Sequence, residues 1–323
     1  MFLKIMFYAM LALVLLMFFP ACNKMETCEE CNFSEIRGFV IDTEGTKYIS
    51  TDDGLFSLSE NGWMKESSIM LNYELRDIDL GADENLWAAT NKGLLNVFAD
   101  TLISSSVYEL VSDDIRHIDI DDRNNLYLAT PAGVSVFYEG QWYDTTGRDA
   151  MFLGHPITDI ATSSNNFTYV TLLGGGVGRF SANIDGITGA TLFDVDWAGL
   201  KSNTVFTVFI DDTVQYYGTD RGVAIHYTQF TKWDWENIRQ TDGLLSDTVL
   251  SIVMDQEKTL WFGTPKGLSR FDGEKWSAYT QAVDGLLSDT IQFMAVDPSG
   301  LLWIASPEGF TQFDGQEFIH YLK

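Results

Sequence analysis

Cysteine, histidine and basic residues are scarce in this chain of 323 residues, and each shortage excludes a class of function. The three cysteines, Cys22, Cys28 and Cys31, all precede residue 35, so no disulfide bond can stabilise the rest of the chain. Cys28 and Cys31 could form a small local disulfide or remain free thiols. The two glutamates between them disfavour a redox centre, because a reactive thiol needs a lowered pKa.

The few histidines and the missing motifs give little support to catalysis. The four histidines, at positions 117, 155, 226 and 320, are not spaced as metal ligands. The chain has neither a Gly-x-Ser-x-Gly nucleophile motif nor a phosphate-binding loop. Asp-rich turns could hold calcium, but no turn has a complete set of oxygen ligands, so we expect no metal and no cofactor. A glycosidase pair of carboxylates ~5–9 Å apart remains an alternative.

Positive charge is outnumbered throughout the chain. There are 46 Asp and Glu residues against 20 Lys and Arg residues, which gives a formal net charge of −26. Such a chain repels nucleic acid and anionic lipid headgroups, so neither is expected as a partner. The acidic residues are dispersed among apolar segments, which indicates a soluble folded surface rather than a disordered tail.

The N-terminus has the features of an export signal. Lys4 precedes an apolar run from Ile5 to Phe19, which is too short to span a bilayer comfortably and ends just before Cys22. This segment resembles a bacterial lipoprotein signal, in which Cys22 is acylated. We therefore expect a signal peptide over 1–21, a tether over 22–34 and a folded domain over 35–323. The resemblance implies a lipid anchor in the outer membrane, facing the periplasm or the cell surface. Ordinary secretion and an uncleaved membrane anchor are the alternatives.

A glycine recurs at intervals of 39 to 46 residues along the folded domain. These glycines are Gly54, Gly93, Gly133, Gly176, Gly222, Gly267 and Gly309. Each lies between short apolar segments separated by turn residues, and a period near forty residues with about four strands is typical of a β-propeller. The repeats cover Ile36–Ser68, Leu75–Ser104, Ile115–Thr145, Ile157–Phe193, Val205–Trp235, Val249–Tyr279 and Ile291–Tyr321. We therefore predict an all-β fold, a seven-bladed propeller of four-stranded antiparallel blades.

Aromatic residues mark the second and fourth strands of the repeats. Seven of the nine tryptophans fall at repeat positions, where a flat ring can fill the wedge between two blades. Trp233 is assigned to the fourth strand of its repeat, whereas Trp197 and Trp235 lie outside the repeat pattern. Both chain ends coincide with repeat ends, so closing the ring does not require the termini to exchange strands.

Residues 255–273 read Asp-x-x-x-x-Leu-Trp-Phe-Gly-Thr-x-x-Gly-Leu-x-x-Phe-Asp-Gly and resemble the two-component-regulator propeller repeat. The segments 242–247 and 284–289, both Asp-Gly-Leu-Leu-Ser-Asp, resemble the linker between blades of that family. The resemblance extends over 36–323 and is weakest in the fourth repeat. It implies a periplasmic sensor-type propeller scaffold, here without a kinase domain, and a bias towards oligosaccharide ligands.

The second residue of each innermost strand should lie at the mouth of the channel, where the loops of a propeller converge. These seven mouth positions are Arg37, Arg76, Arg116, Thr158, Phe206, Leu250 and Gln292. Three neighbouring arginines could clamp a carboxylate or sulfate, such as a uronic acid. The alternative is that each arginine pairs with the acidic residue two positions earlier.

Other candidate ligand-binding residues come from the turns between second and third strands and from the longer loops. The turns bring Asn91, Lys92, Asp220, Arg221 and Lys266 towards the same rim, and the loops bring His155, Trp197 and Trp235. An exposed aromatic ring can stack on a sugar, although buried packing is an equally good explanation for each of them.

Together these features favour an exported binding module that captures an oligosaccharide, such as an acidic glycan, or an envelope protein. A second interpretation is a polysaccharide lyase or glycoside hydrolase with a carboxylate site in the channel. A third is a structural envelope lipoprotein that docks a protein complex. Propellers serve all three purposes, so the fold alone does not decide between them.

Overall fold

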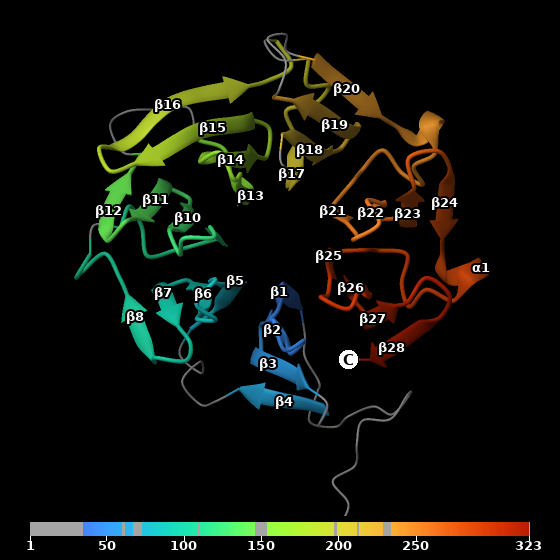
Figure 1. The fold of residues 1–323 in the computed structure, drawn as a ribbon, viewed down its shortest axis with the longest axis horizontal. Helices are drawn as coiled ribbons and strands as arrows, with labels where there is room; N and C mark the ends of the chain where they lie inside the picture. Colours follow the sequence, from blue (N-terminus) through green and yellow to red (C-terminus); the bar gives the residue numbers. More distant parts are fainter. Residues whose placement is uncertain are drawn as a thin grey trace, which may run out of the picture.

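The computed structural model describes residues 35–59, 62–66, 73–108, 110–145, 154–196, 199–211, 213–228 and 234–322. The predicted signal peptide, the tether with its cysteines and Trp197 lie outside the described residues. Seven sheets of four antiparallel strands surround a central channel (Figure 1). The predicted seven-bladed propeller is therefore confirmed. No helix within the described ranges has the length and apolar character needed to cross a membrane.

Each blade takes four consecutive strands. Blade 1 contains β1 (Ile36–Ile41), β2 (Lys47–Thr51), β3 (Gly54–Ser59) and β4 (Gly62–Glu66); blade 2 contains β5 (Leu75–Leu80), β6 (Leu86–Thr90), β7 (Gly93–Asn96) and β8 (Thr101–Ile103). Blade 3 contains β9 (His117–Ile120), β10 (Leu126–Thr130), β11 (Gly133–Tyr138) and β12 (Gln141–Asp144); blade 4 contains β13 (Ile157–Thr162), β14 (Phe167–Leu172), β15 (Gly176–Asn183) and β16 (Gly186–Phe193).

The remaining three blades follow the same pattern. Blade 5 contains β17 (Val205–Asp211), β18 (Val214–Thr219), β19 (Gly222–Tyr227) and β20 (Asp234–Ile238); blade 6 contains β21 (Ser251–Met254), β22 (Leu260–Thr264), β23 (Gly267–Phe271) and β24 (Trp276–Tyr279). Blade 7 contains β25 (Phe293–Val296), β26 (Leu302–Ser306), β27 (Gly309–Phe313) and β28 (Phe318–Leu322). Short helical turns at Gln240–Asp242 and at α1 (Gln281–Asp284) precede blades 6 and 7.

Within each blade the first strand lies next to the channel and the fourth lies at the outer edge (Figure 1). Blades 1 and 7 meet at a seam, and the described strands of the two blades form separate sheets. Blade 4 is enlarged, because β15 and β16 have eight residues each.

The repeating glycine is needed because it opens the third strand in a conformation that other residues rarely adopt. Gly222 has a φ of 102°, and a Cβ atom there would lie 2.0 Å from the carbonyl oxygen of Ile238. The preceding Thr219 fixes the turn, since its hydroxyl donates to the Gly222 carbonyl and accepts the N–H of Arg221. Five other blades repeat this arrangement with Thr51, Thr90, Thr130, Thr264 or Ser306.

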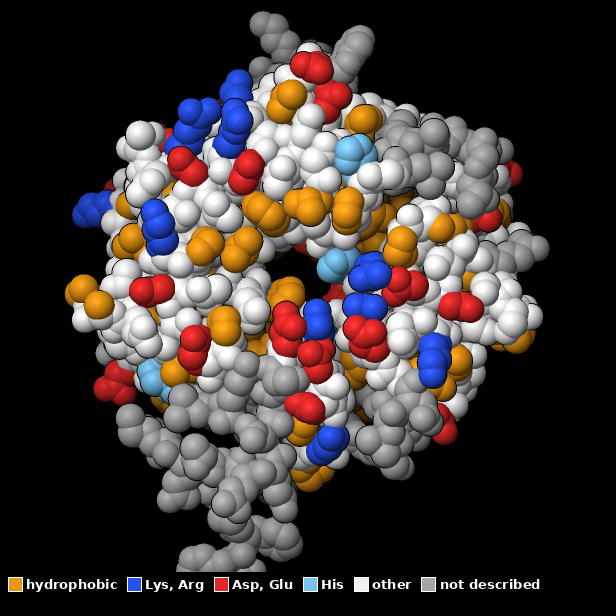
Figure 2. Space-filling view, turned by 180° about the vertical axis from the view of Figure 1, so that it is seen from behind, with side chains coloured by type: hydrophobic (Ala, Val, Ile, Leu, Met, Phe, Trp, Pro, Cys, Tyr) orange, Lys and Arg blue, Asp and Glu red, His pale blue; other side chains and the backbone are white. Residues whose placement is uncertain are grey.

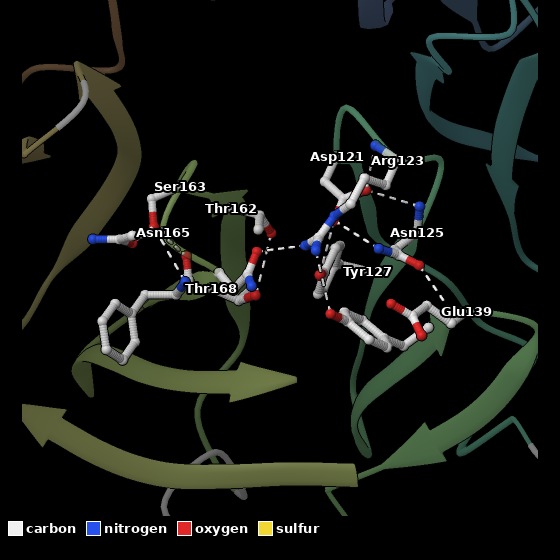
Figure 3. Close-up of polar contacts among 12 residues, drawn as sticks. Asp121, Arg123, Asn125, Tyr127, Glu139, Thr162, Ser163, Asn165 and Thr168 are labelled. Carbon is white, nitrogen blue, oxygen red and sulfur yellow. Dashed lines mark hydrogen bonds and ion pairs between the residues drawn. The ribbon is translucent and has the colours of Figure 1, made fainter. Parts of the chain in front are cut away.

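Acidic turns between first and second strands hold the aromatic residue of their own blade. Asp255 accepts the backbone N–H groups of Glu257 and Thr259 and, at 2.9 Å, the indole N–H of Trp261. In blade 3, Asp121 does the same for Tyr127, and Arg123 reaches across to Asn166 in the turn of blade 4 (Figure 3). These turns therefore anchor the second strand and also join neighbouring blades.

The expectation for Trp233 and Trp235 requires a correction. Trp235 on β20 pairs with His226 on β19. In blade 6, Trp276 pairs with Phe271 in the same way, so the two tryptophans take equivalent positions. Trp235 therefore occupies the fourth-strand repeat position that the sequence assigned to Trp233, a residue outside the described ranges. The hairpin loop between β19 and β20 is longer than its counterparts, so counting residues from the glycine misplaced the strand by two.

Candidate functional site

All seven mouth positions line one cavity of about 400 Å³ at the opening of the channel. The cavity also includes Glu35, His117 and Phe293. Figure 2 shows this opening with basic, acidic and histidine side chains on one side and hydrophobic side chains on the opposite side. The repeat pattern thus identified a ring of residues that converge in space from seven segments of the chain.

The three arginines of the mouth are all ion-paired. Arg37 contacts Glu35 at 3.1 Å and Asp52 at 2.9 Å. Arg76 contacts Glu74 at 2.9 Å, and both Arg76 and Arg116 contact Asp114, at 3.7 Å and 2.6 Å respectively. Pairing with the acidic residue two positions earlier, the alternative set out from the sequence, is therefore present in all three blades.

Some polar atoms of the mouth nevertheless keep unused hydrogen-bonding capacity. The Nε atoms of Arg76 and Arg116 and the Oε1 atom of Gln292 are buried and have no hydrogen-bond partner among the described residues. Buried polar atoms are normally paired, so a ligand or water in the cavity is expected to satisfy them.

The opposite half of the mouth is apolar. Phe206, Leu250 and Phe293 come from blades 5, 6 and 7, and Phe293 keeps 36% of its surface exposed. An aromatic ring exposed beside polar groups can pack against the C–H face of a sugar or another apolar surface. The mouth therefore offers two surfaces of different character to one ligand.

Below the mouth, the channel wall is charged in blades 2 to 4. Asp77, His117 and Asp159 occupy the same position of three successive innermost strands, one residue after the mouth position. Asp77 accepts the backbone N–H of Ile118 in blade 3 at 3.2 Å. Asp159 accepts the N–H of Val208 in blade 5 at 3.0 Å. These carboxylates join each blade to the next.

A second layer of carboxylates lies two residues further along the strands. Asp79 accepts the N–H groups of Leu80 and of Ile120 in blade 3, both at 2.8 Å. Burial raises the pKa of Asp79 well above its ordinary value, and the charge of Asp119 raises it further. Burial likewise raises the pKa of Asp119 to about 7, although hydrogen bonds from Thr162 oppose the shift. We infer that these two carboxyl groups are not both ionised at neutral pH.

His117 interacts with the upper layer. Its Nδ1 lies 3.5 Å from Asp77 Oδ2. Burial lowers the pKa of His117, but the hydrogen bond and charge of Asp77 outweigh that effect and the pKa is raised overall. Sequence reasoning did not single out these channel residues, since it considered His117 only as a possible metal ligand. The alternation of Asp77 with Asp79 and of His117 with Asp119, which places each pair on one face of its strand, was the signal that could have found them.

The other candidate residues do not line the mouth cavity. Asn91 accepts the N–H of Glu74 through its side chain, and Lys92 lies over the ring of Tyr73 at 5.7 Å. Asp220, Arg221 and Lys266 sit in the turns that open the third strands. His155 is exposed and packs beside Gly175, and Trp235 stacks on His226 in the wedge between blades 4 and 5.

No group of three or more His, Cys, Asp or Glu side chains suited to a metal ion occurs within the part of the chain that the structure describes. The channel carboxylates instead accept hydrogen bonds from backbone N–H groups of the next blade. These hydrogen bonds link neighbouring blades.

Comparison with known proteins identifies the repeat and the fold. The sequence profile of the family described as "Two component regulator propeller" matches residues 243–266, which include the linker and second strand of blade 6. No curated protein sequence matches the chain.

Solved structures with the same fold come from several kinds of protein. PorZ, a surface component of the type-IX secretion system of Porphyromonas gingivalis, superposes with a TM-score of 0.69 at 16% identity, covering 87% of this chain and 46% of PorZ. Virginiamycin B lyase from Staphylococcus aureus gives a TM-score of 0.65 at 12% identity, covering 85% of this chain and 92% of the lyase.

The extracellular domain of the hybrid two-component system BT3049 from B. thetaiotaomicron gives a TM-score of 0.49 at 17% identity, covering 89% of this chain. This chain spans 46% of that domain, as it does of PorZ, and so corresponds to about half the length of either. At these identities the likenesses establish the propeller fold and nothing about the ligand.

Proposed function

We propose that this chain, which carries the two-component-regulator propeller repeat, is an exported, lipid-anchored binding module that captures an oligosaccharide at the mouth of its channel. The observation that carries the proposal is the convergence of all seven mouth positions on one cavity of about 400 Å³. A concave site with a few polar groups and an apolar wall is the usual form of a small-ligand site.

The two halves of the mouth fit a glycan that bears few charges. The guanidinium groups of Arg37, Arg76 and Arg116 are largely neutralised by their carboxylate partners, so a polyanion would gain little. Fixed donors and acceptors of such pairs suit sugar hydroxyls, and the unused Nε atoms of Arg76 and Arg116 can bind one carboxylate, as in a uronic acid. Phe206 and Phe293 would pack against the C–H face of the same sugar.

The proposal of a lipid anchor rests on the sequence before Cys22, which resembles a lipoprotein signal. Acylation of this cysteine would hold the propeller at the outer membrane, and the acidic surface would keep it off anionic headgroups. Replacing Cys22 by Ser should abolish incorporation of radiolabelled palmitate and release the protein into the soluble fraction. Continued membrane fractionation of the unlabelled variant would contradict the anchor.

A panel of neutral and acidic oligosaccharides, measured by thermal shift and calorimetry, tests the binding site. The double substitution Arg76→Ala and Arg116→Ala should weaken binding of the best acidic glycan at least about tenfold, because each charge-assisted hydrogen bond contributes roughly 1.5–3 kcal/mol. The double substitution Arg123→Ala and Lys258→Ala removes the same charge from turns between first and second strands and should leave the affinity unchanged. If the two variants bind the glycan with equal affinity, the glycan does not bind at the mouth.

An enzyme with its site in the channel is the second candidate, because Asp79 and Asp119 form a carboxyl pair with raised pKa values. Against it, both oxygens of Asp79 already accept backbone hydrogen bonds, which is the geometry of a structural group. Incubation with the bound glycan followed by mass spectrometry distinguishes the two. Cleavage that Asp119→Asn abolishes while binding persists would favour the enzyme.

A further inference from the structure

The wedge between blades 4 and 5 contains a group of buried polar atoms that make no hydrogen bond of good geometry with the described residues. They are Tyr169 Oη, Arg179 Nε, Gln215 Nε2, Tyr217 Oη and Trp235 Nε1. The side chains of Tyr169, Gln215 and Tyr217 are fully buried. Unsatisfied buried polar atoms are rare in folded proteins and destabilising, so five in one wedge require an explanation.

Ring contacts place these side chains together. The Tyr169 and Tyr217 rings lie 6.4 Å apart, and Trp235 stacks on Tyr217 at 5.8 Å and on His226 at 4.5 Å. Arg179 is the residue directly opposite Tyr169 on the neighbouring strand, and the two side chains interact. Burial raises the pKa of Tyr217 well above its ordinary value, and the positive charge of Arg179 opposes that shift. Burial lowers the pKa of His226 to about 4, and the charge of Arg179 lowers it further.

The matched wedge between blades 6 and 7 shows that the propeller does not need polar groups here. At the positions of Gln215 and Tyr217 it has Leu302 and Ile304, as the strand pairing shows. At the positions of His226 and Trp235 it has Phe313 and Phe318. The blade 4–5 wedge thus carries four polar side chains where hydrocarbon is sufficient to pack the blades.

The arginine of the wedge also differs from its counterpart. Arg270 takes the same repeat position in blade 6 and pairs with Asp272 at 3.4 Å. In blade 4 the corresponding residue is Ser181, and no ion pair of Arg179 occurs among the described residues. Arg179 instead lies over the rings of Phe167 and Phe193, at 4.7 Å and 5.3 Å. Its charge therefore lacks a counter-ion.

The unpartnered atoms are donors rather than acceptors. Arg179 Nε, Trp235 Nε1 and Gln215 Nε2 can only donate, and both tyrosine hydroxyls can donate. Gln215 Oε1 already lies 3.0 Å from His226 Nδ1. A water molecule would bring two more hydrogens to a group in which donor hydrogens already outnumber the acceptor oxygens. A small anion accepts several donors, brings no hydrogen and balances the charge of Arg179.

We propose that the wedge between blades 4 and 5 binds a chloride ion, held by Arg179, Trp235, Gln215 and the hydroxyls of Tyr169 and Tyr217. The site is separate from the mouth of the channel and independent of the glycan. It would act as a structural anion that fastens the enlarged blade 4 to blade 5.

Diffraction with bromide in place of chloride tests the site directly. Crystals of the protein equilibrated in sodium bromide should show an anomalous peak at the bromine edge between the Tyr169 and Tyr217 rings. The Arg179→Gln variant should lose that peak. Density for water without an anomalous signal in the wild-type wedge would overturn the proposal.

Thermal unfolding gives a second test in solution. The midpoint should rise by about 5 °C when chloride reaches about 100 times its Kd, relative to gluconate at the same ionic strength. Tyr217→Phe removes one hydroxyl and should raise the chloride Kd several-fold or more. Arg179→Gln should remove the chloride dependence, whereas the matched control Arg270→Gln should retain it.

Tyr217→Phe changes only one oxygen atom, so it keeps the test decisive if Arg179→Gln fails to fold. A wild-type midpoint that is equal in chloride and gluconate would contradict the proposal. So would a chloride dependence that survives in Arg179→Gln.

Discussion

Asp119 lies on β9 in the channel wall, next to β5, which carries Asp79, and the negative charge of Asp119 disfavours ionisation of Asp79. Burial and neighbouring charges raise the pKa of Asp119 to about 7, far above that of an aspartate in an unfolded chain. The folded protein therefore binds a proton that the unfolded chain has already lost between about pH 4 and pH 7. A raised acidic pKa stabilises the fold fully at low pH, and that stabilisation disappears as the pH rises through the folded value.

Asp119→Asn should remove this pH dependence. In urea unfolding of the wild type, titration of Asp119 should lower the free energy of unfolding by up to about 1.4 kcal/mol per pH unit between pH 4 and 7. The variant cannot titrate at this position, so its profile should be flatter and its stability at pH 7 relatively higher. Asp314→Asn, in an exposed hairpin, serves as the control and should keep the wild-type slope. Identical slopes for wild type and Asp119→Asn would refute the raised pKa of Asp119.

The turn that opens each third strand depends on glycine for two separate reasons, conformation and space. Gly222 and Gly273 both have positive φ angles, 102° and 94°. Only Gly222 is also crowded, because a Cβ atom would lie 2.0 Å from the Ile238 carbonyl oxygen, whereas nothing lies within 4 Å of a Cβ atom at Gly273. The pair therefore separates backbone strain from steric overlap.

Gly222→Ala should destabilise the protein by about 3 kcal/mol or more, since the outer strand of blade 5 must move. Gly273→Ala should cost only about 1 kcal/mol, the strain of the left-handed conformation alone. Chemical denaturation of both variants measures the difference. If both variants lose the same free energy of unfolding, the steric overlap with Ile238 contributes nothing to the cost.

The repeat pattern predicted the strands, the number of blades and the ring of mouth residues, because each depends on spacing within one repeat. Contacts between blades could not be predicted in the same way. The bond from Asp77 to Ile118 and the wedge around Tyr217 join residues about 40 residues or more apart, and their partners follow from the closed ring. Trp235 was misplaced because its strand follows a hairpin loop of unusual length.

The ring as a whole is closed at a seam where only side chains and packing join the ends of the chain. Blades 1 and 7 share no sheet. Lys47 bridges them, with its Nζ 4.9 Å from the Trp303 ring and 3.9 Å from Asp297 Oδ2. The seam also contains a cavity of about 670 Å³, lined by residues of both blades. At the other six blade boundaries the chain runs directly from one blade into the next, whereas at this boundary no such linker joins the described blades. We therefore expect the ring to open here first.

Hydrogen exchange should detect that opening. Amides of β2 and β26, beside the seam, should exchange faster than those of β14 and β18, which lie in equivalent positions on either side of the blade 4–5 wedge. Lys47→Met removes the cation over Trp303 and its attraction to Asp297, and should speed exchange in β2 and β26 selectively. Lys258→Met is the matched control: its Nζ contacts Asp211 at 2.8 Å across the blade 5–6 boundary, but its side chain is 68% exposed. Such an exposed pair contributes little, so exchange at the seam should stay unchanged in this variant. Uniform protection around the ring, or equal effects of the two substitutions, would show that side-chain contacts close the seam as firmly as any other blade boundary.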